Sequence, residues 1–303
     1  MIKERVKSMS FSSEVKEEMN CLANLSNKEV VKYELLGYLA SNHIVVEKNK
    51  IRFTTENEYN INRFGKLISN LGYTDYNINM IGKKYCIICK KIELAEISYQ
   101  ENKIYITIKD EIKGKELLEK AFIRGAFLGG GSMNNPTLNY HLQLLFSLEE
   151  NKKIASDILE SYGIYFKTLQ RKNDFVLYTK DGDEISKFLA FINANSSVLK
   201  FEEIRVYRDV RNNVNRKVNC ETANLNKTVN AAMKQIEDIQ FLMKNNILDK
   251  LSKPLQEIAR LRIENPEASL TELGQMLSSP IGKSGVNHRL QALQEKAEQL
   301  KNK

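Results

Sequence analysis

The residues of this sequence best suited to chemistry lie close together near its C-terminal end. They combine cations, an amide, a hydroxyl and an imidazole, and they are Lys283, Ser284, Asn287, His288 and Arg289. Side chains of these types donate hydrogen bonds to base edges in the major groove and to backbone phosphates. We therefore expect them to recognise DNA, which is a binding function and not a reaction.

A second group of cations precedes them, in the stretch "FEEIRVYRDVRNNVNRKV" at residues 201–218. Its members are Arg205, Arg208, Arg211, Arg216 and Lys217. Valines at 206, 210, 214 and 218 recur every four residues, a spacing that predicts one apolar stripe on a helix. The segment 215–228 is rich in Asn and Thr, which favour caps and loops. Two interpretations of that segment stay open: a hydrogen-bonded junction between domains, or a phosphate-binding surface that continues the arginines.

The sequence contains no convincing catalytic or metal-binding motif. Its three histidines have no carboxylate or cysteine at ligand spacing, and Cys86 and Cys89 form a C-x-x-C without a second pair. The "GKS" at 282–284 lacks the earlier glycine of a P-loop, because Leu277 stands there. We expect neither a metal nor a cofactor.

Composition narrows the class of protein. The 303 residues are 42% hydrophobic and 28% charged, which is enough to bury a core, and the net charge of +8 suits a polyanionic partner such as nucleic acid. No apolar run approaches the roughly 18 residues that a membrane span needs. Four scattered cysteines favour a reduced compartment. We expect a cytoplasmic protein with no membrane partner.

The N-terminal part of the sequence contains two copies of a helix–strands–helix pattern. The first copy begins with a helix in "KEVVKYELLGYLASN", and the second begins with one in "KGKELLEKAFIRGAFLGGGS". Each is followed by strands, another helix and a further pair of strands, within residues 28–195. The repeat of about 90 residues predicts an α+β fold made by duplication, of the form αββαββ.

The C-terminal part is predicted to be all helical. Pro254 opens one helix, a capping box from Ser269 to Glu272 opens the next, and the third has a core stripe. That stripe comprises Val286, Leu290, Leu293, Ala297 and Leu300. A short helix, a tight link and a longer helix match the helix-turn-helix, whose last helix presents its N-terminal residues to DNA. A plain helical bundle with a solvated polar face is the alternative. We expect domains at 1–200 and 250–303, joined by a helical linker at 201–249.

Two stretches at the same place in the two repeats resemble a known helix. "LLGYLASNH" at 35–43 and "IRGAFLGGG" at 123–131 are similar to the LAGLIDADG helix of homing endonucleases, with Gly37 and Gly125 at its interior glycine. The resemblance implies two helices packed closely together and two saddle-shaped sheets that grip DNA. The metal-binding acid of that motif corresponds here to Asn42 and Gly130, both neutral. The resemblance therefore implies a nuclease scaffold without nuclease activity.

The whole chain resembles the WhiA family of bacterial regulators. The similarity rests on "FSSEVKEE", on "RGAFLGGGSMNNP" with "YHLQ", on "VNRKVNCETANLNKT" and on "ASLTELGQML" with "KSGVNHRL". It implies a non-enzymatic, sequence-specific DNA-binding regulator of transcription, with a role in sporulation or cell division in Gram-positive bacteria. The alternative is a cell-division and chromosome-segregation factor that acts through protein partners or non-specific DNA binding. The implied partners are double-stranded DNA and another transcription factor or cell-division protein, and the implied location is the nucleoid.

Overall fold

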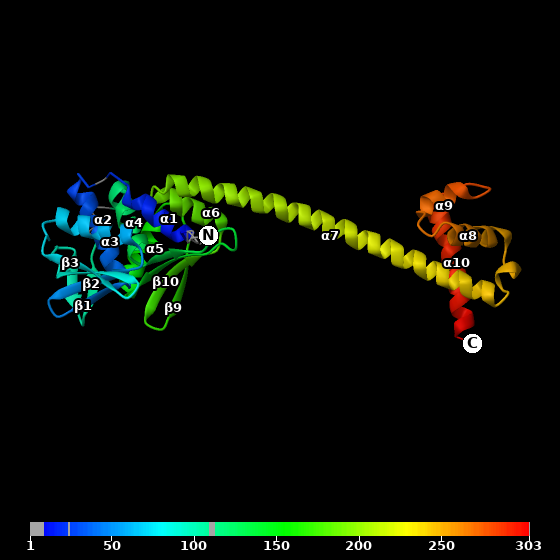
Figure 1. Cartoon of the computed structure of the whole chain (residues 1–303), viewed down its shortest axis with the longest axis horizontal. Helices are drawn as coiled ribbons and strands as arrows, with labels where there is room; N and C mark the ends of the chain where they lie inside the picture. The colour runs from blue at the N-terminus through cyan, green and yellow to red at the C-terminus, as the bar shows by residue number, and fades with distance from the viewer. Residues whose placement is uncertain (1–8, 24, 109–112, 303) are drawn as a thin grey trace, which may run out of the picture. The chain divides into compact units, whose positions relative to one another are not determined.

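The computed structural model describes residues 9–23, 25–108 and 113–302. The chain divides into two compact units, Met1–Asp209 and Val210–Lys303 (Figure 1). Each unit is described by itself below. The domain boundaries that the sequence suggests, at residues 200 and 249, stay predictions.

The first unit begins with helix α1 (Phe11–Asn20) and then contains the two repeats. The first repeat comprises α2 (Lys28–Ala40), β1 (Ile44–Glu47), β2 (Lys50–Thr55), α3 (Glu58–Asn70), β3 (Tyr76–Ile81) and β4 (Lys84–Lys90). The second comprises α4 (Glu116–Gly130), β7 (Gly131–Met133), β8 (Leu142–Phe146), α5 (Glu149–Ser161), β9 (Lys167–Arg171) and β10 (Asp174–Thr179), and is followed by α6 (Gly182–Phe191). Between the repeats lies the hairpin of β5 (Ile97–Gln100) and β6 (Lys103–Ile106), which the sequence did not predict.

The two repeats build sheets of identical strand order. One sheet is ordered β1-β2-β4-β3 and the other β7-β8-β10-β9, and all their pairings are antiparallel. Cross-strand partners such as Phe53 with Ile87, and Leu144 with Leu177, are fully buried. Because side chains alternate along a strand, one face of each sheet packs into the core, and the other face is free to contact a partner. The predicted duplicated αββαββ fold is thus confirmed.

Helices α2 and α4 pack against each other at their glycines. A Cβ atom on Gly37 would lie 2.0 Å from the Phe122 carbonyl oxygen, and one on Gly125 would lie 1.9 Å from the Glu34 carbonyl oxygen. No side chain fits at these distances, so the two backbones touch directly. This is the close approach that the interior glycines predicted.

A buried ionic cluster lies on the same contact. Glu34 of α2 is fully buried, and its carboxylate accepts hydrogen bonds from Arg63 Nε of α3 at 2.7 Å and from Arg124 Nε of α4 at 2.9 Å. Burial alone would raise the pKa of Glu34, but the two guanidinium groups lower it below its ordinary value. Arg63 also donates to the Leu22 carbonyl at 3.0 Å, so the cluster fixes the chain between α1 and α2 as well.

The second unit takes in the C-terminal part of the long helix α7 (Asn195–Lys244) and three further α-helices. These are α8 (Lys253–Glu264), α9 (Leu270–Met276) and α10 (Lys283–Lys301), with a 3-10 turn η2 (Leu248–Lys250) before them. Pro254 stands at the start of α8, and both bonds of the predicted capping box of α9 are present. Val286, Leu290, Leu293 and Ala297 of α10 are buried against Ile239 and Leu242 of α7 and the side chains of α8 and α9. None of the helices in the described part of the chain has the length and apolar character to cross a membrane.

The contact between α2 and α4 predicts a large effect from one methyl group. Replacing Gly125 with Ala places a Cβ inside contact distance of the Glu34 backbone, so the helices must separate and the core around them must repack. We expect a loss of about 2–3 kcal/mol in the free energy of unfolding, measured by urea denaturation followed by circular dichroism.

Gly282→Ala is the matched control, because a Cβ at that position meets nothing within 4 Å. We expect the control to lose no more than about 1 kcal/mol, which is the cost of Ala at a helix N-cap. Equal stability of the Gly125→Ala protein would show that the two backbones are not in contact.

Candidate nucleic-acid interface

The turn between α9 and α10 is held by a backbone contact that needs a glycine. The Ile281 N–H donates to the Gly274 carbonyl at 3.1 Å, and a Cβ on Gly274 would lie 2.2 Å from the Ile281 carbonyl oxygen. Leu273 and Leu277 on the α9 side of the turn, and Val286 on the α10 side, are buried in the core of the second unit. The turn therefore fixes the direction in which α10 leaves α9, as recognition by a helix-turn-helix requires.

The first two turns of α10 separate an apolar face from a polar one. Val286 and Leu290 point into the core, whereas Lys283, Ser284, Asn287 and His288 are exposed. Gly282 is the N-cap and carries no side chain, so residue 282 adds no capping group of its own to the first N–H groups of the helix. The N-terminus of a helix favours anions. The structure thus brings four of the five predicted residues together at an end of a helix that suits a phosphate.

Arg289 differs from the other four. It is only half exposed, and it lies near Glu257 of α8. The Ser278 N–H donates to Glu257 at 2.6 Å and, with the Ser278 hydroxyl, lowers the pKa of this carboxyl group, to which Arg289 adds a smaller contribution. Arg289 therefore lies beside α8, at the place where Glu257 of α8 contacts the turn.

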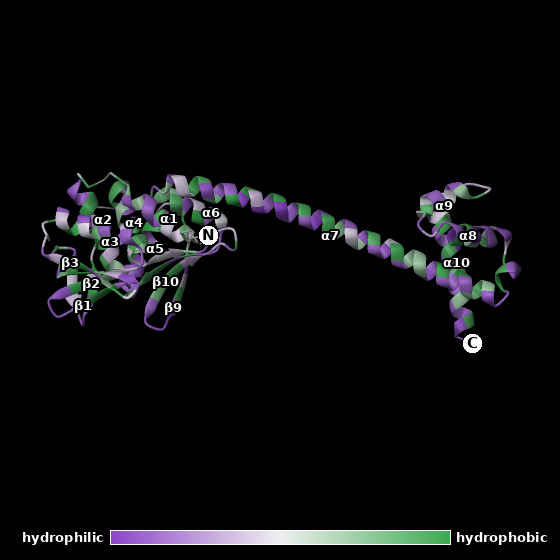
Figure 2. Ribbon diagram, in the orientation of Figure 1, coloured by the Kyte–Doolittle hydropathy of each residue, from purple (hydrophilic) through white to green (hydrophobic). Residues whose placement is uncertain are grey.

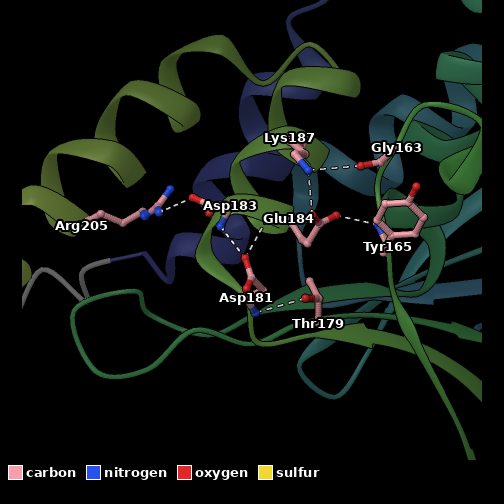
Figure 3. Close-up of polar contacts among 8 residues, drawn as sticks. All are labelled: Gly163, Tyr165, Thr179, Asp181, Asp183, Glu184, Lys187 and Arg205. Atoms are coloured by element: carbon pink, nitrogen blue, oxygen red, sulfur yellow. Dashed lines mark hydrogen bonds and ion pairs between the residues drawn. The ribbon is translucent and has the colours of Figure 1, made fainter.

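Two of the upstream arginines are engaged within the first unit. Arg205 forms an ion pair with Asp183 of α6 (Figure 3). It forms another with Glu202, one turn before it on α7. Arg208 donates to the Pro136 carbonyl and lies over the Tyr140 ring, 4.4 Å from its centre. These contacts attach the start of α7 to the first unit, a role that the sequence did not indicate.

Arg211, Arg216 and Lys217 are exposed on α7, as is every residue from 209 to 231. The Asn- and Thr-rich segment is helical, and its two side-chain hydrogen bonds join residues one turn apart. Those bonds run within α7, so they give no support to the interpretation as a hydrogen-bonded junction. The surface interpretation stays a prediction.

The two positions that correspond to the nuclease acids lie side by side at the ends of α2 and α4. The Asn42 N–H donates to the Leu145 carbonyl at 3.2 Å. A Cβ on Gly130 would lie 2.5 Å from that same carbonyl oxygen and 3.4 Å from Asn42 Oδ1. A carboxylate therefore has no room at position 130. Within the described residues, no group of three or more His, Cys, Asp or Glu side chains could hold a metal ion.

A lysine that the sequence did not single out lies at the end of α4. Lys16 of α1 donates to the Leu128 carbonyl at 3.4 Å, and its Nζ lies 5.6 Å from the centre of the Phe127 ring. Asn60 donates to the same carbonyl at 2.7 Å. Burial lowers the pKa of Lys16 to about 8. The C-terminal end of a helix attracts a cation, and here the protein supplies its own ammonium. The only signal in the sequence was the place of Lys16 on α1, between the core residues Val15 and Met19.

Helices paired through glycines, two four-stranded sheets and a helix-turn-helix define a LAGLIDADG-like protein with an added DNA-binding module. The family description "WhiA LAGLIDADG-like domain" matches residues 119–211, and "WhiA C-terminal HTH domain" matches residues 214–297. The "Probable cell division protein WhiA" of Clostridium tetani is 39% identical, over 96% of this chain and 98% of that protein. The protein of the same name from Staphylococcus haemolyticus is 40% identical, over 97% of this chain and 98% of that one.

A solved structure gives the same result. The crystal structure of full-length WhiA from Thermotoga maritima is 28% identical, covers 96% of this chain and 99% of that one, and superimposes with a TM-score of 0.58. The chain belongs to the WhiA family.

The buried ammonium of Lys16 predicts a pH-dependent stability. Its pKa is lower in the folded state than in the unfolded state, so below pH 8 the folded protein bears the whole cost of keeping this partly buried group charged. As the pH rises from 8 towards 10.5, the folded state loses the proton and that cost disappears. We expect Lys16→Met to raise the free energy of unfolding at pH 7 by about 1 kcal/mol, less than the full pKa shift implies because the side chain is only partly buried.

Urea denaturation at pH 7, 8, 9 and 10 measures this difference. The advantage of the Lys16→Met protein should shrink with each step above pH 8. The exposed Lys153→Met on α5 is the control, and it should not differ from the wild type at any of these pH values. A less stable Lys16→Met protein at pH 7 would contradict the assigned burial cost.

Proposed function

We propose that this protein is a sequence-specific DNA-binding regulator of transcription, with a role in cell division or sporulation, and that it acts at the nucleoid in the cytoplasm. The observation that carries the proposal is the exposed polar face at the start of α10, set on a tight turn after α9. The family description names a helix-turn-helix in this region, and the relatives are named as cell division proteins. The net charge of +8 suits the polyanionic partner.

We expect the side chains at the start of α10 to make different kinds of contact with DNA. The Asn287 amide can form two hydrogen bonds with an adenine edge, and Lys283 can donate to guanine or to a phosphate. Ser284 and the first N–H groups of α10 suit a backbone phosphate. Arg289 supports the recognition helix from the side of α8, and His288 adds a further exposed donor at the interface.

The first unit and α7 add contacts that do not depend on base sequence. Arg216 and Lys217 are exposed cations on α7 and suit the DNA backbone, and Arg211 is exposed on the same helix. On the outer face of one sheet, Gln143, Tyr178 and Lys167 lie in register across β8, β10 and β9. A row of polar side chains on a sheet face fits the groove or backbone of a duplex. Binding by this unit to a cell-division protein is the second candidate role, and the name of the relatives favours it.

We propose further that the protein does not cleave DNA. Cleavage of a phosphodiester needs anionic ligands that hold a divalent cation next to the phosphate. Position 130 has no room for such a side chain, and Asn42 is an amide. The Lys16 ammonium at the end of α4 also opposes the entry of a divalent cation by like-charge repulsion.

Substitutions on α10 test the recognition face. We expect Lys283→Ala and Asn287→Ala each to weaken binding to a genomic target duplex by about tenfold, because each removes a contact worth 1–3 kcal/mol. Fluorescence anisotropy with a labelled duplex measures the affinity. Asn287→Ala should also reduce the preference for the target over a random duplex, whereas loss of a phosphate contact weakens both equally.

Gln299→Ala is the matched control, since it removes an exposed amide from the far end of the same helix. It should bind as the wild type does. All three variants should keep the melting temperature of the wild type, because the substituted side chains are exposed. Unchanged affinity in both Lys283→Ala and Asn287→Ala would remove this face from the interface.

The absence of nuclease activity has a direct test. Supercoiled plasmid incubated with the protein and Mg²⁺ or Mn²⁺ should remain supercoiled on an agarose gel, because the helix ends provide no carboxylate for the metal. Reproducible nicking that EDTA abolishes would refute the proposal. The Gly125→Ala protein would then show whether the activity depends on the paired helices.

A further inference from the structure

The second unit carries an apolar stripe that none of its described residues covers. It runs along α7, and its large members are Val210, Val214, Val218, Leu225, Val229 and Met233, each between 46% and 63% exposed. Figure 2 shows hydrophobic residues recurring among hydrophilic ones along this helix. Large apolar surfaces that stay in water usually mark a site of association.

The composition of this part of α7 also argues for a partner. Between residues 210 and 233 the helix contains seven asparagines, two threonines and four β-branched valines. These residue types have low helix propensity, and most helical stability in proteins comes from the packing of an apolar face. A helix of this composition, exposed on all sides, is poorly stabilised by its own sequence. Contact along the apolar stripe would supply the missing stabilisation.

Charged residues within the stripe indicate which partner fits. Residues 211, 214, 218, 221 and 225 are spaced by three and four, which is the heptad spacing of a coiled coil. Two of the five are charged, Arg211 and Glu221, and both are exposed. Neither has an ion-pair partner among the described residues. They have opposite charges and lie five residues before and five residues after Arg216.

We propose that α7 pairs with α7 of a second copy of this chain, antiparallel, about a two-fold axis at the level of Arg216. In this register Arg211 faces Glu221 of the other copy, and Val214 faces Val218 of the other copy. Each pair occurs twice because the interface is isologous. The two central valine layers are apolar, and the two flanking ion pairs set the register, as single polar layers do in coiled coils.

The same charges disfavour a parallel pair. Parallel helices would place Arg211 against its own copy and Glu221 against its own copy, and like charges in a core position are strongly unfavourable. In the antiparallel pair, the two copies of Lys217 lie near the axis, but they are exposed and screened by solvent. The short apolar region and this repulsion make the pair weak. We therefore expect dimers that form in the micromolar range.

A charge-swap series tests the proposal on the full chain. Sedimentation velocity from 1 to 100 μM should show a monomer–dimer equilibrium for the wild type. Arg211→Glu alone and Glu221→Arg alone should each shift the midpoint to at least tenfold higher concentration, because each sets like charges in two layers. The double variant Arg211→Glu with Glu221→Arg restores opposite charges and should dimerise as the wild type does. Val214→Asp should remain a monomer throughout.

Each variant is checked by circular dichroism and thermal unfolding, since all the substituted residues are exposed and the folded units should persist. Asn219→Asp, on the polar side of the same helix, is the control and should dimerise normally. A wild type that stays monomeric at 100 μM would overturn the proposal. So would a dimer that is unaffected by the single charge reversals, or a double variant that fails to recover, since the interface would then lie elsewhere or have another register.

Discussion

Direct backbone contact between α2 and α4 is the constraint on which the first unit depends. Gly37 and Gly125 let the two helices touch, and Glu34 joins the same contact to α3 and α4 through two buried arginines. Removing Glu34 would leave two buried guanidinium groups in the core without the carboxylate that they share, which is costly. Each helix also leads directly into its own sheet, so the contact that joins the helices sets the two sheets in place. The two repeats are therefore held together along the contact between α2 and α4.

The same close approach determines what the helix ends can do. At the C-terminal ends of α2 and α4, Asn42 and Gly130 lie against the Leu145 carbonyl, and a side chain at position 130 would collide with it. Lys16 then places an ammonium next to the Leu128 carbonyl at the end of α4. The end of the helix pair is therefore neutralised by the protein itself. Its chemistry suits a scaffold for binding, and we propose that the specificity for base sequence lies in the exposed start of α10.

Much of this arrangement was predictable because it rests on local patterns. The repeat, the interior glycines, the capping box at Ser269 and the core stripe of α10 follow from spacing and residue type, and the structure contains each of them. Contacts between distant segments could not be predicted. The pairs of Arg205 with Asp183, and of Arg208 with Pro136, depend on where α7 crosses the first unit. The place of Lys16 depends on how α1 packs against α4. The valine stripe of α7 was found in the sequence, but its exposure was not.

The central claim is that the polar face at the start of α10 selects where the protein binds on the chromosome. The most direct test is a genome-wide binding map of the wild type, compared with a map of a Lys283→Ala, Asn287→Ala double variant expressed at the same level. The account predicts discrete peaks that share a sequence motif, and the loss of these peaks in the double variant while diffuse DNA association remains. Peaks that persist unchanged in the double variant, or a wild-type map without discrete sites, would contradict it.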